Sequence, residues 1–252
     1  MTFKEWISNP SGKGSAVTTH KDMYHKMYSD KLNLVILREG NTFKYTLYKK
    51  DDYMFLIHMK VPSEVIKGFY YDVVIEFSTT NSAYSVGGTL DRYDIRLFSN
   101  SPDFMFTHAH AYNKAKLLFT DLSSKLPKQS LKDVAKERNP KDEIGYVKSI
   151  FFAYLICVQR GLLNKVVYYA AKPYNTKELL NNIAHASDVY TLRQEAEERK
   201  KNIERRKKNL EIRQSNEKRN VGNSTKNISS SNTVKYTNRS STVKTSKTVK
   251  KK

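Results

Sequence analysis

The stretch that decides the fold is DIRLFSNSPDFMFTHAHAYNKAKLL, residues Asp94 to Leu118, because extended sequence gives way to helical sequence within it. Its first part belongs to TLDRYDIRLFS, which we predict to be a strand, and FMFTHAHAY is predicted as the last strand of the block. After Tyr112 the spacing of the leucines becomes helical. The stretch also carries His108 and His110, so it bears on function as well as on fold.

The sequence before this stretch is rich in strand patterns separated by turns. In TFKYTLYKK, Phe43, Tyr45 and Leu47 occupy alternate positions, which is the period of a half-buried strand. LNLVILREG is predicted as the strand before it, with Gly40-Asn41 as a hairpin-like turn between the two. YMFLIHMKV and FYYDVVIEFS complete a set of roughly six strands, the pattern of an antiparallel meander, sandwich or barrel.

The sequence after it predicts three helices. NKAKLLFTDLSSKL places leucines at helical spacing and stops before Pro127. KDEIGYVKSIFFAYLICVQRG has acidic residues in its first turn and Gly161 at its end, and it is apolar nearly all round, so we predict a central buried helix. NTKELLNNIAHAS is a shorter third helix. The predicted fold class is α+β, with an antiparallel β-rich N-terminal half packed on a helical C-terminal half, followed by a basic helix and a disordered-type tail.

The positive charge of the chain is concentrated in its last quarter. The 252 residues carry a net charge of +20, of which residues 193–252, with 19 Lys and Arg against 6 Asp and Glu, supply +13. Residues 188–219 are strong helix formers without Gly or Pro, whereas the Ser/Thr/Lys-rich residues beyond them lack the apolar surface to fold alone. The sequence therefore predicts a 1–30 N-terminal arm, a 31–186 core domain, a 187–219 charged helix and a 220–252 extended tail.

Blocks of like charge are typical of interaction segments, and cationic ones bind phosphates or acidic surfaces. We therefore predict that the basic extension contacts nucleic acid or an acidic protein partner. The predicted contact residues are Arg199, Lys200, Lys201, Arg205, Arg206, Lys207, Lys208, Arg213, Lys218, Arg219, Lys235, Arg239, Lys244, Lys247, Lys250, Lys251 and Lys252.

His108 and His110 are the strongest hint of metal chemistry in the sequence. On a strand, residues two apart share a face, so His-x-His supplies two metal ligands. His58, Asp72 and Asp103 are candidates for further ligands, but they fall in no recognisable metal-binding spacing. We interpret the pair as two partly exposed histidines on a sheet face, and we expect no metal, no cofactor and no catalytic residue.

Other motifs favour the same interpretation. SGKGS, residues 11–15, lacks the first glycine of a phosphate-binding loop, because position 7 is isoleucine, and it is interpreted as a flexible loop. The single cysteine, Cys157, lies in an apolar run and is interpreted as a core residue in a chain without disulfides. No secretory leader and no membrane-spanning segment is expected, because no apolar run is long enough. Aromatics interleaved with lysines suggest core packing, or stacking of single-stranded bases.

Two segments carry a resemblance to a known class of proteins. YDIRLFSNSPDFMFTHAHAYNKAKLL, residues 93–118, and RNPKDEIGYVKSIFFAYLICVQRGLL, residues 138–163, resemble virion structural proteins of tailed bacteriophages, over roughly residues 30–170. The resemblance implies a structural role at the neck, portal or tail, as in a head-tail connector, with contacts to other virion subunits and to further copies of the chain. It implies a location in the virion, and in the host cytoplasm before assembly, and it supplies no catalytic residues.

The function expected from the sequence is therefore non-enzymatic. The core would dock in a multi-subunit particle, and the basic extension would anchor on packaged nucleic acid or acidic neighbouring subunits. The alternative is a free, sequence-nonspecific DNA- or RNA-binding protein, and a metal-dependent enzyme built on the two histidines is the least favoured interpretation.

Overall fold

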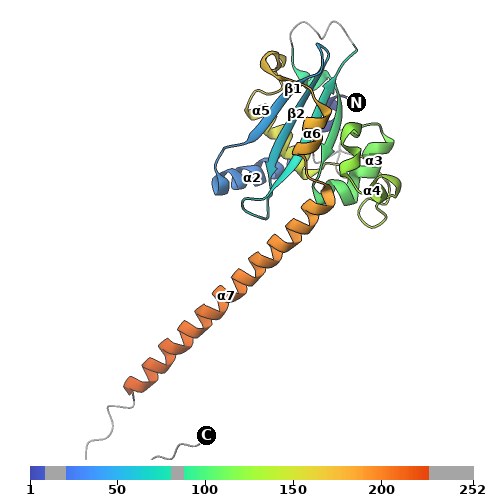
Figure 1. The fold of residues 1–252 in the computed structure, drawn as a ribbon. Coiled ribbons are helices and arrows are strands. Elements are labelled where there is room, and N and C mark those ends of the chain that lie inside the picture. The colour runs from blue at the N-terminus through green and yellow to red at the C-terminus, as the bar shows by residue number, and fades with distance from the viewer. Residues whose placement is uncertain (9–20, 81–87, 227–252) are drawn as a thin grey trace, which may run out of the picture. The chain divides into compact units, whose positions relative to one another are not determined.

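The computed structural model describes residues 1–8, 21–80 and 88–226, with side chains described for all of these except 21–25 and 217–226. The chain forms two units, Met1–Arg199 and Lys200–Lys252. The first unit holds a sheet with helices on both of its faces, and the described part of the second unit is helical (Figure 1). The α-helices are α1 (Phe3–Ser8), α2 (Lys21–Glu39), α3 (Ala109–Lys114), α4 (Lys128–Lys132), α5 (Lys148–Gln159), α6 (Thr176–Asn182) and α7 (Ala186–Lys226).

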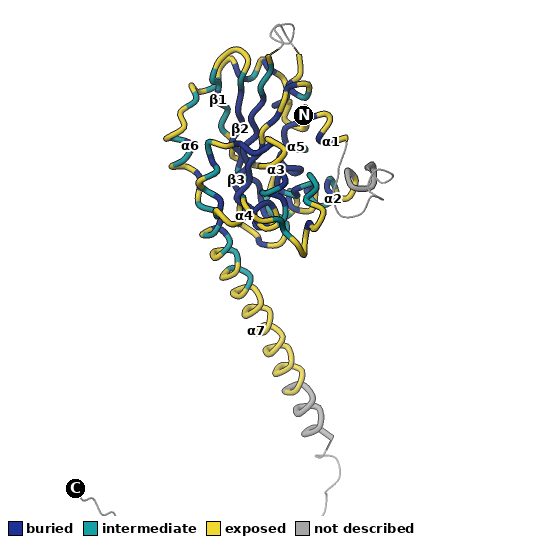
Figure 2. Tube along the Cα trace, turned by 90° about the vertical axis from the view of Figure 1, so that its right-hand side faces the viewer, coloured by how far each residue is buried: buried dark blue, intermediate teal, exposed yellow. Residues whose placement is uncertain are grey.

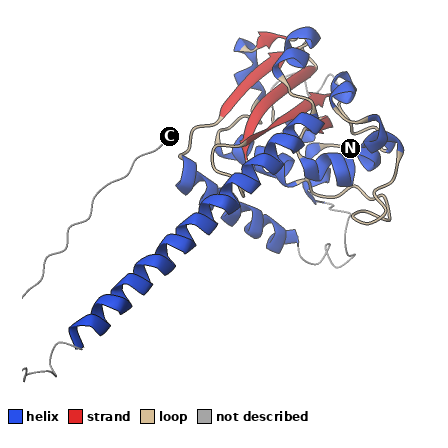
Figure 3. Ribbon diagram, turned by 60° about the horizontal axis from the view of Figure 1, so that its bottom comes forward, coloured by secondary structure: helices blue, strands red, loops and turns tan. Residues whose placement is uncertain are grey.

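The sheet has five strands in the order β4-β3-β2-β1-β5 and is mostly antiparallel. Its four main strands form a meander, which is one of the three predicted β arrangements (Figure 3). The short β5 pairs parallel with β1. The strands are β1 (Lys44–Lys49), β2 (Met54–Pro62), β3 (Tyr70–Ser78), β4 (Asp94–Ser99) and β5 (Lys172–Pro173).

The two faces of the sheet differ in chemistry. Because side chains alternate along a strand, Ile57, Ile75 and Leu97 share one face, and this face packs on α5, the central buried helix that the sequence predicted. The opposite face carries His58, Asp72 and Glu76, all buried. Figure 2 shows β2 and β3 buried along their length. One enclosed face is therefore apolar, and the other mixes buried charged residues with apolar ones such as Val74.

The strand predicted at LNLVILREG is wrong, because this segment is the second half of α2. Tyr28, Leu32 and Val35 are buried at helical spacing, which sets the conformation more strongly than the short apolar run does. Gly40 ends the helix with φ +83° and its amide donates to the Ile36 carbonyl at 2.8 Å. The predicted hairpin-like turn at Gly40-Asn41 is thus a helix terminus.

The strand predicted at FMFTHAHAY is also wrong. Phe104–His108 forms a π-helical turn that continues into α3. Phe104, Met105, His108, Ala109 and Tyr112 are buried, which is a helical pattern rather than an alternating one. Within the fold-deciding stretch, only the strand ending at Ser99 is confirmed, as β4.

The helix predicted over residues 113–126 is shorter and broken. After α3 ends, the chain turns through Lys116 at φ +58°, and the amide of Leu97 donates to the Leu117 carbonyl at 2.7 Å along the edge of β4. A 3-10 helix, η5 (Thr120–Lys125), follows. The consecutive buried residues Leu117, Leu118 and Phe119 need an extended backbone to reach the core.

The later helices follow the prediction more closely. α5 begins only at Lys148, so the acidic residues predicted for its first turn lie outside it, and Gly161 follows its end at φ +65°. α6 begins at the predicted place, where the Asn175 side chain accepts from the amides of Lys177 and Glu178. The α+β class, with a mostly antiparallel sheet in the N-terminal half and helices in the C-terminal half, is confirmed.

Candidate nucleic-acid interface

The most concentrated charge in the described chain lies on α7. The basic segment, residues 199–213 of α7, holds eight of the predicted contact residues and only two carboxylates, Glu204 and Glu211. At 1.5 Å per residue it is about 21 Å long. Every one of its residues is exposed.

The turns before the basic segment carry ion pairs that support the helix. Arg199 Nη2 lies 3.2 Å from Glu195 Oε2, and Arg193 Nη2 lies 2.9 Å from Glu197 Oε1. Both pairs are four residues apart, and each stabilises an exposed helix by roughly 0.2–0.5 kcal/mol. The acidic residues therefore cluster before the segment and the basic ones within it.

The cations of the basic segment lie on all sides of the helix. At about 100° per residue, they fall into three rows separated by large angles. Ile203 and Leu210, which are 53% and 55% exposed, lie between the first two rows. The rows are Arg199, Arg206 and Arg213; Lys200 and Lys207; and Lys201, Arg205 and Lys208.

The remaining predicted contact residues lie further along the chain. Lys218 and Arg219 lie in α7, in the part of the helix where only the backbone is described. The other predicted contacts lie outside the described residues, as does SGKGS. They are Lys235, Arg239, Lys244, Lys247, Lys250, Lys251 and Lys252.

The two histidines do not share a sheet face, because both lie in a helical segment, where residues two apart point in roughly opposite directions. His108 is buried rather than partly exposed, and burial lowers its pKa below the usual value despite the nearby charge of Asp103. His110 is half-buried, and its Nδ1 lies 2.8 Å from Asp142 Oδ1. The pair is thus divided between two separate environments.

His58 and Asp72, which the sequence offered only as distant metal ligands, contact each other directly. His58 Nε2 lies 2.7 Å from Asp72 Oδ1, and Lys60 Nζ lies 2.5 Å from the same oxygen. Asn100 Nδ2 donates to Asp72 Oδ2 at 2.9 Å. Burial alone would raise the pKa of Asp72, but the contacts with His58 and Lys60 outweigh it and hold the pKa below its usual range. Within the described chain, no group of three or more potential ligands could hold a metal ion.

Four residues further along β3, on the same face, the fully buried Glu76 repeats this arrangement. Lys50 Nζ lies 3.1 Å from Glu76 Oε2, and Arg96 Nη1 lies 3.4 Å from Glu76 Oε1. Each buried carboxylate on this face therefore has a lysine or arginine from a neighbouring strand, or from the turn beside it, within 3.4 Å. Sequence reasoning missed the pattern, although the even spacing of Asp72 and Glu76 within one predicted strand already places both on one face.

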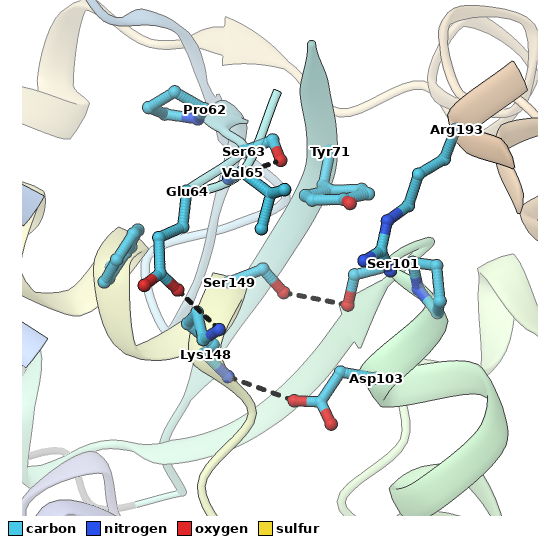
Figure 4. A pocket seen from close by; sticks show the side chains of 12 residues that line it. Pro62, Ser63, Glu64, Val65, Tyr71, Ser101, Asp103, Lys148, Ser149 and Arg193 are labelled. Carbon is cyan, nitrogen blue, oxygen red and sulfur yellow. Dashed lines mark hydrogen bonds and ion pairs between the residues drawn. The ribbon is translucent and has the colours of Figure 1, made fainter. Parts of the chain in front are cut away.

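A small cavity of about 80 Å³ opens between β3 and the start of α5 (Figure 4). Its charges are balanced, because Lys148 pairs with Glu64 at 2.6 Å and Asp103 faces the same opening as Arg193. The Ser149 hydroxyl lies 3.0 Å from that of Ser101, and no histidine lines the cavity. Among the lining residues, the hydroxyls therefore have no histidine of the kind that activates a serine nucleophile.

Cys157 is fully buried in α5, and burial raises the pKa of its thiol to about 12. A protonated, enclosed thiol is a core residue rather than a nucleophile.

None of the helices in the described part of the chain is both long and apolar enough to cross a bilayer. Comparisons with protein-family models, with curated proteins and with solved structures find no match.

Proposed function

We propose that the protein is a non-enzymatic nucleic-acid anchor, in which the basic segment of α7 binds phosphates without sequence preference. The observation that carries the proposal is the distribution of eight exposed cations around the whole circumference of one helix. A flat acidic protein surface meets only one side of a helix. A helix lying in the major groove of a duplex has phosphates on both flanks, so cations on several sides are used together.

The setting we propose is a virion of a tailed bacteriophage, where the core of the chain docks in the particle and the basic segment contacts packaged nucleic acid. The support is the resemblance of residues 93–118 and 138–163 to virion structural proteins. The lack of a histidine beside the Ser101 and Ser149 hydroxyls, and the buried thiol of Cys157, fit a structural role for the described part of the core.

The test is duplex binding by full-length protein, measured by fluorescence anisotropy between about 50 and 200 mM salt. One variant replaces Arg199, Arg206, Lys207 and Arg213 with Gln. Because each duplex phosphate contact contributes about 0.9 to the slope of log K against log salt, the slope should flatten by about 3 to 4. The matched control replaces four exposed lysines of the first unit with Gln and should keep most of the slope. They are Lys4, Lys26, Lys67 and Lys177.

Equal slopes for the two variants would show that the basic segment is not the contact, and the nucleic-acid proposal would then be wrong. Sedimentation of the wild-type protein distinguishes a virion structural protein from a free nucleic-acid-binding protein. A virion structural protein should assemble with itself or with particle subunits, whereas a free binder should stay small while binding the duplex.

A further inference from the structure

Two hollows adjoin at Phe106, and they carry chemistry that the basic segment does not have. The first is an open channel of about 800 Å³, whose walls include Tyr190 and five charged residues. These are Lys132, Lys136 and Arg138 together with Asp133 and Glu137. The second is a recess of about 270 Å³, mainly apolar, whose walls include Gln129 and Ser130. Phe106 lines both hollows.

Phe106 is an aromatic side chain left accessible in a largely buried segment. Its neighbours Phe104, Met105 and His108 are buried, whereas 38% of Phe106 is exposed. Tyr190 meets it edge to face, with ring centroids 4.9 Å apart, and the Arg138 guanidinium lies 5.9 Å from the Phe106 ring centroid. An exposed aromatic cluster with a cation beside it is how proteins stack unpaired bases.

The channel offers contacts for the phosphates of a nucleotide, and the recess offers contacts for its base. The three cations of the channel outnumber its two carboxylates, Asp133 and Glu137, and would follow a phosphate backbone. The recess is close to the lower limit of small-ligand pockets, about 300 Å³, and offers an apolar wall with the Ser130 hydroxyl and the Gln129 carbonyl for the edge of a base. The Gln129 amide nitrogen already donates to Asp133, which also lines the recess. A base inside a duplex is already stacked on both faces, so only an unpaired base can enter.

We propose that the channel and the recess around Phe106 form a stacking site for single-stranded nucleic acid. The base lies against Phe106 in the recess, and its phosphates lie along Lys132, Lys136 and Arg138. The site deepens the proposed function by adding a preference for unpaired strands to the duplex contacts of α7. It rests on nucleic acid being the partner, but on residues other than those of the basic segment.

The test uses the full-length chain with the four Gln substitutions in α7, which remove half of the cations of the basic segment and so weaken its phosphate binding. Fluorescein-labelled hexathymidylate is compared with an abasic strand of the same length and charge. Stacking of one base on an aromatic side chain changes affinity by about 5- to 150-fold. Phe106→Ala should weaken hexathymidylate binding by that factor and leave the abasic strand unaffected.

The matched control is Tyr169→Ala. Tyr169 is 61% exposed and has Lys49 Nζ 6.0 Å from its ring centroid, but it lines neither hollow, so its loss should change nothing. Phe106→Trp keeps a stacking ring and should retain binding. The fluorescence of this variant should be quenched by unlabelled hexathymidylate, against the background of the buried Trp6.

Several results would overturn the stacking site. One is no binding of hexathymidylate at about 50 mM salt, and another is an equal loss for both strands in Phe106→Ala. A third is quenching of the fluorescence of the Phe106→Trp variant only by an acidic peptide, which would assign the hollows to a protein partner. None of these results depends on duplex binding by α7, so the two proposals fail separately.

Discussion

At the scale of single residues, His108 is an imidazole kept neutral by its surroundings. Burial lowers its pKa from 6.5, while the charge of Asp103 and a hydrogen bond to the Glu143 backbone act in the opposite direction. The Tyr112 ring lies against the His108 ring, with centroids 6.2 Å apart. The Nδ1 atom of His108 has no hydrogen-bond partner among the described residues. The folded state therefore resists taking up a proton that the unfolded chain accepts.

This difference predicts a loss of stability in mild acid. As the pH decreases below the unfolded pKa near 6.5, the unfolded chain binds more protons than the folded one. The free energy of unfolding therefore decreases together with the pH, until the pH reaches the lowered pKa of the folded state. The slope contributed by one group is at most about 1.4 kcal/mol per pH unit. Urea unfolding at pH 7.5 and 5.5 should show a smaller difference for His108→Gln than for the wild type. Identical differences would mean that His108 is not the titrating group.

Asp72 predicts a large effect of a single substitution. Its carboxylate is shared by His58, Lys60 and Asn100, and breaking a buried pair from one side costs roughly 3–5 kcal/mol. Asp72→Asn should lower the free energy of unfolding by about 3 kcal/mol in urea titrations near neutral pH. Asp52→Asn is the control, because the exposed Asp52 pairs only with Lys49 in the described structure, 2.7 Å away, and its loss should leave the midpoint nearly unchanged. A similar shift for both variants would contradict the stabilising role of the buried cluster.

At the scale of elements, the end of α2 depends on a backbone conformation rather than on contacts. Gly40 has φ +83°, and a Cβ built there would meet nothing within 4 Å, so only the left-handed backbone limits substitution. Gly40→Ala should destabilise the fold by about 1 kcal/mol, measured by denaturant titration. Gly40→Asn should cost less, because Asn tolerates this region. Equal costs for the two variants would contradict the left-handed backbone as the factor that limits substitution at Gly40.

The elements also show which parts of the fold the sequence could predict. β1 to β4, α5, α6 and α7 carry strong periodicity or caps, such as Asn175 and Gly161, and these were predicted with shifted ends. The second half of α2 and the residues 104–112 were predicted as strands, because runs such as LVIL and FMF suit either structure. Burial by distant residues decided between the two, and a single sequence does not contain that information.

The sequence likewise predicted one part of the candidate site and missed another. The cations of α7 follow from charge counting alone, and their placement on an exposed helix agrees with the sequence. The hollows around Phe106 need residues from three separated segments, 105–110, 127–138 and Tyr190, which only the folded chain brings together. The buried charge on β3 was missed because Asp72 and Glu76 look like ordinary surface residues in a strand pattern.

At the scale of the whole core unit, both edges of the sheet are partly covered by other segments of the chain. The amide of Ile95 donates to the Met1 carbonyl, and Leu97 exchanges hydrogen bonds with the backbone of residues 117–119 at the edge formed by β4. At the other edge, β5 covers Tyr48 and Lys49 of β1, and the exposed Lys44 begins that strand. A second chain therefore finds few free backbone groups to pair with, and a lysine at the open part of the edge discourages its approach. Any contact between copies of this chain should accordingly rest on side-chain surfaces that leave each subunit separable, rather than on strands joined into one continuous sheet.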